Sequence, residues 1–199
     1  MFTGLIEGVG KLASRETRGG DARLRIAVGT LPFGNVHLGE SISVNGCCLT
    51  VVEFDADSFA ADASNETLAL TTLGRLAIGA SLNLERAMLP TDRLGGHLVS
   101  GHVDGVGTVR AVRDDARAQR WSFAVPVPLL RYIAAKGSVC VDGVSLTVNA
   151  VDGEGFEVAL VPHTLAHTAF GATSIGDEVN LEVDLVARYV ERLLQERNA

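Results

Sequence analysis

A cysteine and a serine occupy equivalent positions in an internally repeated sequence. A shift of 97 residues aligns the two halves of the chain, and 17 of the 42 positions between 44–85 and 141–182 are identical. Cys48 aligns with Ser145 in this comparison. A thiol and a hydroxyl can both act as nucleophiles, but they need different activation. The exchange predicts two related pockets with unequal chemical roles.

Other polar residues also differ between the copies. Leu5 aligns with His102, Asn45 with Asp142 and Glu66 with His163, whereas Thr50 and Thr147 are the same residue. Each candidate also has a plain structural interpretation, since a lone cysteine is often a small buried hydrophobe and a lone histidine is often structural. Cys48 is favoured over Cys47 because its equivalent is polar and because neighbours on a strand face opposite sides.

Several common catalytic and metal-binding arrangements have no support. His97 and His102 are five residues apart, which in an extended strand sends their rings to opposite faces, and the sequence contains no CxxC or HExxH. The GxSxG, GxGxxG and GxxxxGK[ST] motifs are also absent. We therefore expect no metal, and a hydrolase using Ser145 and His102 is weakly supported.

Each copy of about 90 residues is long enough for one small domain. Short runs such as SISVNG, CLTVVEF and SLNLERA end at Gly, Asn or Asp or at a change of pattern, which is typical of brief antiparallel strands. About six such runs per copy predict a small closed barrel, because closure removes the sheet edges. We place the first barrel at 1–96 and the second at 97–184. Short helices are predicted near 65–74, 128–135 and 162–171.

The segment 184–198 has apolar doublets every four residues, which predicts an amphipathic helix. Its apolar stripe must be buried against another surface. The helix is either a lid on its own barrel or an oligomer contact, and the sequence leaves these two alternatives open.

Charge and composition narrow the class of protein. The net charge of −7 and the absence of a Lys or Arg run disfavour nucleic-acid binding. The beginning of the chain lacks a signal-peptide pattern, and the uncharged stretch 158–176 is interrupted by Pro162, His163 and His167, so we expect no membrane span. Three cysteines are an odd number for disulfides, which favours a cytoplasmic protein.

Several motifs together resemble the riboflavin synthase family of the α-chain type, which is built from lumazine-binding repeats. These motifs are MFTGLIEGVG, NGCCLTV, GGHLVSGHVDGVG, KGSVCVDGVSLTVN, PHTLAHT and EVDLVARYVERLL, and the resemblance covers nearly the whole chain. It implies a mainly β protein with two tandem six-stranded antiparallel barrels of the Greek-key type. It further implies a C-terminal helix, residues 185–199, that assembles a homotrimer.

The resemblance also implies an activity. Two molecules of 6,7-dimethyl-8-ribityllumazine would be converted to riboflavin and 5-amino-6-(D-ribitylamino)uracil by transfer of a four-carbon unit. The reaction would need no cofactor, and each active site would hold both substrate molecules. Such a site would lie between the first barrel of one chain and the second barrel of its neighbour.

Substrate-binding residues follow from the resemblance position by position. The first pocket would contain Gly4, Leu5, Ile6, Cys48, Leu49, Thr50, Asp62, Ala63, Ser64, Asn65, Glu66 and Thr67, with Ser41 close by. The second would contain Gly101, His102, Val103, Lys136, Ser145, Leu146, Thr147, Val161, Pro162, His163, Thr164, Leu165 and Ala166. His163 stands where some family members carry Glu.

Catalytic roles are assigned from the mismatch pattern together with the family motifs. We expect His102, with the Thr147 hydroxyl nearby, to transfer protons, and Cys48 or Ser145 to add transiently to the acceptor carbon. Asp142 and Asp184 would orient groups or shuttle protons, and Ser41 completes the set. Cys140 is expected to be inert core.

One rival within the same fold is a binding protein without catalysis, like the lumazine proteins of luminous bacteria, which hold a fluorescent ligand as an optical antenna. Those relatives lose the reactive groups at the positions of Cys48 and His102 and lack the trimer helix. Both residues and the helix sequence are present here, which favours the enzyme.

Overall fold

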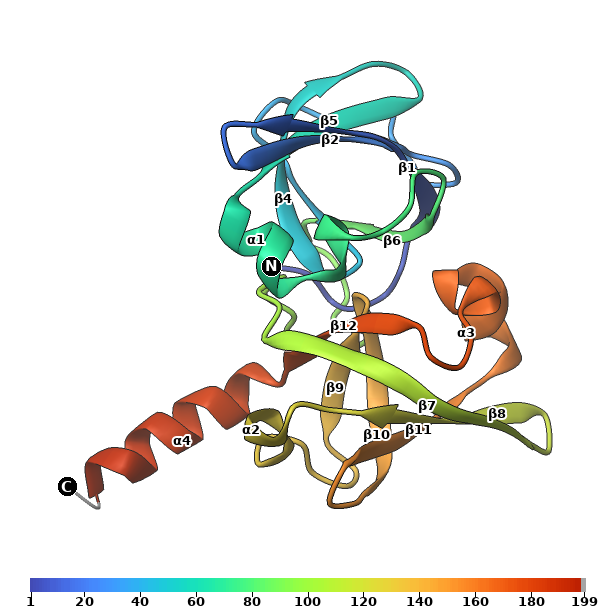
Figure 1. The fold of residues 1–199 in the computed structure, drawn as a ribbon, viewed down its shortest axis with the longest axis vertical. Coiled ribbons are helices and arrows are strands. Elements are labelled where there is room, and N and C mark those ends of the chain that lie inside the picture. The colour runs from blue at the N-terminus through green and yellow to red at the C-terminus, as the bar shows by residue number, and fades with distance from the viewer. Residues whose placement is uncertain (198–199) are drawn as a thin grey trace.

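The computed structural model describes residues 1–197 as two β-barrels, one above the other in Figure 1, with a single long helix projecting from the second. The first barrel consists of β1 (Gly8–Arg18), β2 (Asp21–Ala27), β3 (Ser41–Val44), β4 (Cys47–Phe54), β5 (Ser58–Ala63) and β6 (Ser81–Arg86). The second consists of β7 (Gly105–Asp115), β8 (Ala118–Ala124), β9 (Ser138–Val141), β10 (Val144–Val151), β11 (Gly155–Leu160) and β12 (Glu178–Val183).

Both barrels have the same topology. Their strands close in the orders β1-β2-β5-β4-β3-β6 and β7-β8-β11-β10-β9-β12, with every neighbouring pair antiparallel. Even the irregularities repeat, because register shifts at 12/14 and 51/53 recur 97 residues later at 109/111 and 148/150. The predicted pair of six-stranded antiparallel barrels is confirmed.

Alternation of buried and exposed side chains explains why these segments form strands of a closed barrel. In β2, Ala22, Leu24 and Ile26 point inward and are buried, while the residues between them are partly exposed. The interior of the second barrel is filled more by aromatic rings. Trp121, Phe123, Phe156 and Phe170 form a buried cluster whose ring centroids lie 5.3–6.4 Å apart.

Short helices occupy the predicted places. They are α1 (Asn65–Leu70) with the 3-10 turn η1 (Thr72–Gly74), α2 (Val127–Leu130), and α3 (Pro162–His167) with η2 (Ala169–Ala172). The Ser64 hydroxyl begins α1 by accepting the backbone N–H of Thr67 at 3.1 Å. At α3, Pro162 takes the first helical position, where its missing N–H costs no bond.

Two equivalent asparagines join the barrels by crossed hydrogen bonds. The Asn83 amide donates to the backbone carbonyl of Asp142 at 2.9 Å, and the Asn180 amide donates to that of Asn45 at 2.8 Å. Their carbonyl oxygens accept the backbone N–H groups of Ala169 and Thr72. All of these groups are buried, so each needs its partner.

Asp142, which we predict to be catalytic, belongs to this junction and has a structural role in it. It has φ of 46°, the same value as Asn45, and both occupy a turn between two strands. Its carboxylate Oδ1 accepts the backbone N–H of Asn180 at 2.7 Å, just as the Asn45 side chain accepts that of Asn83. Both line a cavity of about 570 Å³ between the barrels. The Asn-to-Asp exchange therefore serves a turn that tolerates either residue.

The last helix, α4 (Leu185–Arg197), confirms the predicted amphipathic segment. It points away from both barrels in Figure 1, and its stripe of Val186, Tyr189, Val190, Leu193 and Leu194 is exposed by 48–65%. The interpretation as a lid on its own barrel is therefore wrong. Residues 198 and 199, which we assigned to the same segment, lie outside the described residues. No helix within residues 1–197 has the length and apolar character to span a membrane.

We predict that Asp142→Asn changes how stability depends on pH. Burial raises the pKa of the Asp142 carboxyl from 3.8 to about 7. The folded chain then holds this proton more tightly than the unfolded chain, so its stability falls as the pH rises from about 4 to about 7. Asparagine cannot ionise, so at pH 8 the variant should gain about 2–4 kcal/mol over the parent.

Urea unfolding of both proteins at pH 5 and pH 8 measures this difference. Substitution of the exposed Asp57 by Asn is the matched control and should leave the pH dependence unchanged. A constant difference between Asp142→Asn and the parent at both pH values would contradict the assignment.

Candidate active site

Buried glutamates hold the two segments that precede the barrels. The Glu182 carboxylate accepts the backbone N–H groups of Ser100, Gly101 and His102 at 2.7, 2.9 and 3.0 Å. The equivalent Glu85 accepts the N–H groups of Thr3 and Gly4 at 2.6 and 3.0 Å, and the Thr3 hydroxyl as well. Burial raises the pKa of both glutamates, and these bonds oppose the rise. The segments carrying Leu5 and His102 are thus held by matching anchors.

Each segment lies against the other barrel, which corrects our division of the pockets. The Cys48 N–H donates to the Gly101 carbonyl at 2.9 Å, and the Ser145 N–H donates to the Gly4 carbonyl at 2.8 Å. A Cβ atom at Gly101 would lie 2.6 Å from the Cys48 Cβ, so only glycine permits this approach. The structure therefore groups 101–103 with Cys48, and 4–6 with Ser145.

The hairpin of β3 and β4 adds Ser41 to the first group. Ser41 pairs with Thr50 in register, two residues along β4 from Cys48. Ser41, Cys48, Thr50 and His102 therefore lie along one junction, with the Cys48 side chain half-buried and those of Thr50 and His102 exposed. We name this set the thiol pocket.

The second group is built in the same way around β10. Ser138 pairs with Thr147, two residues from Ser145, and Leu5 follows the carbonyl that Ser145 binds. We name this set the hydroxyl pocket. His102 and Thr147 thus belong to different pockets of one chain, so the contacts within a single chain do not make the pairing that we predicted between them.

Ser145 has a partner, His97, that the repeat did not predict. The Nδ1 atom of His97 lies 2.7 Å from the Ser145 hydroxyl oxygen. His97 is only 9% exposed, and burial lowers the pKa of its imidazole, with the Asp184 carboxylate opposing this shift. His97 belongs to the segment between the aligned parts of the copies. Comparison of the copies could not identify it, although its place in the GGH motif was a signal.

Helix α4 reaches back to the segment that bears His102. The Arg188 guanidinium donates to the Asp104 carboxylate at 2.7 Å and to the His102 carbonyl at 3.1 Å. Asp104 also accepts the backbone N–H of Val183. Asp184 accepts the N–H of Val186 at 2.9 Å at the first turn of α4. Asp184 therefore begins the helix, and its charge lies close enough to act on the imidazole of His97.

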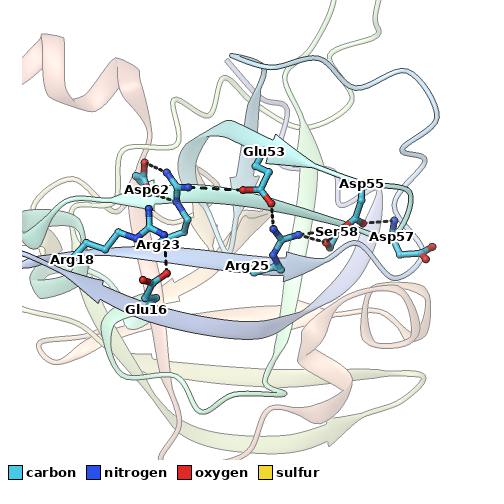
Figure 2. A network of polar contacts seen from close by, with 9 residues as sticks. All are labelled: Glu16, Arg18, Arg23, Arg25, Glu53, Asp55, Asp57, Ser58 and Asp62. Carbon is cyan, nitrogen blue, oxygen red and sulfur yellow. Dashed lines mark hydrogen bonds and ion pairs between the residues drawn. The ribbon is translucent and has the colours of Figure 1, made fainter.

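The segments 62–67 and 161–166 form the beginnings of α1 and α3 and are mostly exposed. The Asp62 carboxylate, however, is already bound. Arg23 holds it with two hydrogen bonds of 2.8 Å, within a ladder of charges on the outer wall of the first barrel (Figure 2). That pairing lowers the pKa of Asp62. Lys136 is exposed at φ of 70°, in the loop that leads to β9.

Only one of the three cysteines is placed for chemistry. Cys47 is buried, and burial raises the pKa of its thiol to about 12. Cys140 is fully enclosed, and this burial raises the pKa of its thiol well above the usual value. Cys48 is half-buried at the edge of the thiol pocket. Cys140 is buried core as we predicted, and Cys48 is the accessible thiol.

We predict that alkylation of the native protein modifies Cys48 alone. Iodoacetamide reacts with thiolates, and Cys48 is the one cysteine of the three whose side chain is not fully buried. Peptide mass mapping at pH 8 should find one modified cysteine in the native chain and three after denaturation. Cys48→Ala should abolish native labelling, and rapid labelling of Cys47 or Cys140 would contradict this account.

Two closed barrels of one topology, each with its leading segment crossed onto the other barrel, place a thiol and a hydroxyl at equivalent positions. The lumazine-binding domain model matches residues 3–87 and again 100–184, so the chain belongs to the lumazine-binding family.

Relatives of known name match nearly the whole chain. It is 48% identical over 194 residues to a riboflavin synthase of Photobacterium phosphoreum, covering 98% of this chain and 89% of that one. It is 44% identical over 199 residues to a riboflavin synthase of Actinobacillus pleuropneumoniae, covering 100% and 92%. Its fold also matches that of LumP complexed with riboflavin, with a TM-score of 0.85 at 24% identity, over 92% of this chain and 99% of that one.

Proposed function

We propose that this chain is a riboflavin synthase. It converts two molecules of 6,7-dimethyl-8-ribityllumazine to one riboflavin and one 5-amino-6-(D-ribitylamino)uracil. The observation that carries the proposal is the pair of equivalent contacts between a leading segment and a strand of the other barrel, which differ in their reactive group, Cys48 in one and Ser145 in the other. Similar pockets suit two molecules of one compound, and unequal side chains suit their unequal fates.

The reaction begins with loss of a proton from the 7-methyl group of one lumazine, and the resulting anion spreads into the ring. His102 is the candidate base, because its side chain is exposed beside the thiol pocket. Free backbone N–H groups in the glycine-rich segments would stabilise this anion. Those of 100–102 and of Thr3 and Gly4 already donate to glutamates, so this role passes to side-chain donors.

The rival function is ligand binding without turnover. LumP shares the fold, but at 24% identity that likeness concerns architecture alone. Cys48, His102 and α4 are all present in this chain, and Cys48 is accessible. These features favour an enzyme.

We predict that the purified protein forms riboflavin from 6,7-dimethyl-8-ribityllumazine with no added cofactor. Riboflavin absorbance should rise as one molecule for every two lumazines consumed. His102→Gln should slow the rate about a hundredfold by removing the base. A stable fluorescent complex that yields no riboflavin would instead establish the binding function.

The open face of the pockets supports assembly of chains. Thr50, Thr147, Glu66 and His163 are exposed in the single chain, so nothing within residues 1–197 encloses a bound lumazine there. A neighbouring chain can bring its hydroxyl pocket against the thiol pocket, which places His102 and Thr147 in one site. Helix α4 offers the exposed apolar stripe for that contact. We assign it as the oligomerisation helix of a homotrimer that works in the cytoplasm, where free thiols such as these three persist.

We predict that Leu193→Glu separates the chains. A charge on the stripe prevents its burial, because a carboxylate without a partner is costly to remove from water. Sedimentation velocity should give a trimer for the parent and a monomer for the variant, with turnover lost in parallel. Gln195→Glu adds the same charge on the same helix outside the stripe and should stay trimeric. An unchanged oligomer for Leu193→Glu would contradict the role of α4.

A further inference from the structure

The pair of His97 and Ser145 distinguishes the two pockets chemically. The distance of 2.7 Å between Nδ1 and the hydroxyl oxygen is that of a strong hydrogen bond. In the thiol pocket, the Cys48 side chain makes no hydrogen bond within residues 1–197. The repeat therefore gives one pocket an oriented hydroxyl and the other an unattached thiol.

The surroundings hold His97 in place. Its backbone N–H donates to the Thr3 carbonyl at 3.1 Å, and Thr3 is itself fixed by Glu85. The preceding Gly96 is packed so closely that a Cβ atom there would lie 2.1 Å from the Thr3 carbonyl oxygen and 2.9 Å from the Ser145 Cβ. The backbone that carries His97 is therefore held close to Ser145.

The hydrogen bonds of the His97 imidazole determine whether His97 or Ser145 is the donor between them. Burial lowers the pKa of His97, so the ring is neutral near pH 7 and carries one N–H. Its Nε2 atom is buried and has no partner within residues 1–197. A buried N–H without an acceptor is rarer than a buried acceptor without a donor, so the proton belongs on Nδ1. His97 then donates to the Ser145 oxygen and leaves the hydroxyl proton free to point elsewhere.

We propose that His97 is a positioning residue that turns Ser145 into a fixed hydrogen-bond donor toward the pteridine ring. This inference rests on the proposed function and adds a residue to it. The oriented hydroxyl meets the ring oxygens and nitrogens onto which negative charge moves when the 7-methyl proton leaves. A donor already aimed at developing charge needs no reorganisation during the reaction. A donor chain from His97 through Ser145 also polarises the second bond.

A double-mutant cycle tests whether His97 acts through Ser145. We expect His97→Leu to lower kcat about tenfold with little change in KM, as for one lost hydrogen bond that matters most in the transition state. In the Ser145→Ala background, His97→Leu should cost nothing further. His97→Asn should recover most of the rate, because its amide N–H can occupy the position of Nδ1–H. His37→Leu, at a side chain that is 80% exposed, is the matched control.

Equal losses from His97→Leu in both backgrounds would make His97 merely structural and overturn the proposal. So would a His97→Asn variant as slow as His97→Leu, or a His97→Leu variant as fast as the parent. Thermal unfolding of each variant identifies any rate change that comes from loss of the fold.

A second experiment needs no turnover. The scaffold already accepts a cysteine at the equivalent position 48, so Ser145→Cys in a Cys48→Ala chain places a thiol beside His97. Donation from Nδ1–H stabilises a thiolate, so this thiol should react with iodoacetamide at pH 7 several times faster than when His97 is also leucine. Equal rates would overturn the donor role even in a protein that makes riboflavin. A faster rate in a protein that makes none would contradict only the proposed function.

Discussion

The need to satisfy buried backbone groups between the barrels governs this structure. Asn83 and Asn180 each bind a carbonyl and an N–H of the opposite barrel, while Glu85 and Glu182 bind the segments that lead into the strands. A buried amide or carboxylate left without its partner is costly. The barrels can therefore meet in only one register. That register brings Gly4 to Ser145 and Gly101 to Cys48.

The same constraint explains why the two pockets have the same backbone framework but different side chains. The side chains that cross between the barrels, Asn83 and Asn180, are the same in both copies, and so are Glu85 and Glu182, which hold the leading segments. Residues that face outward from the junction are free to change without disturbing it, as Leu5 and His102 have done. Stability and reactivity are thus assigned to different positions of one repeat. The chemistry of either pocket can be altered while the interface that shapes both is preserved.

Much of the fold could be predicted from the repeat. The alternation of apolar residues in SISV and SLNLER indicates strands from local sequence alone, and the same pattern recurs in the second copy. The crossing of the leading segments could not be predicted in this way. The alignment groups Gly4 with the first barrel, and only its contact with Ser145 shows that its segment lies against the second barrel. The exchange of Asn45 for Asp142 also has a conformational explanation that the sequence does not show, because Asn and Asp both tolerate the positive φ of that turn. His97 could not be predicted by comparing the copies, because it has no equivalent residue in the first copy. Cys48, in contrast, could be predicted because its equivalent in the second copy, Ser145, is polar.

The crossed segments have a consequence for how such a protein can arise. Because the strand bearing Cys48 is completed by residues that precede the other barrel, one barrel alone lacks part of the surface around its thiol. A chain with a single repeat of this kind would have to exchange its leading segment with a second copy in order to complete that surface. Joining the two in one gene turns that exchange into an intramolecular contact, and it frees each half to diverge because neither has to serve as both partners.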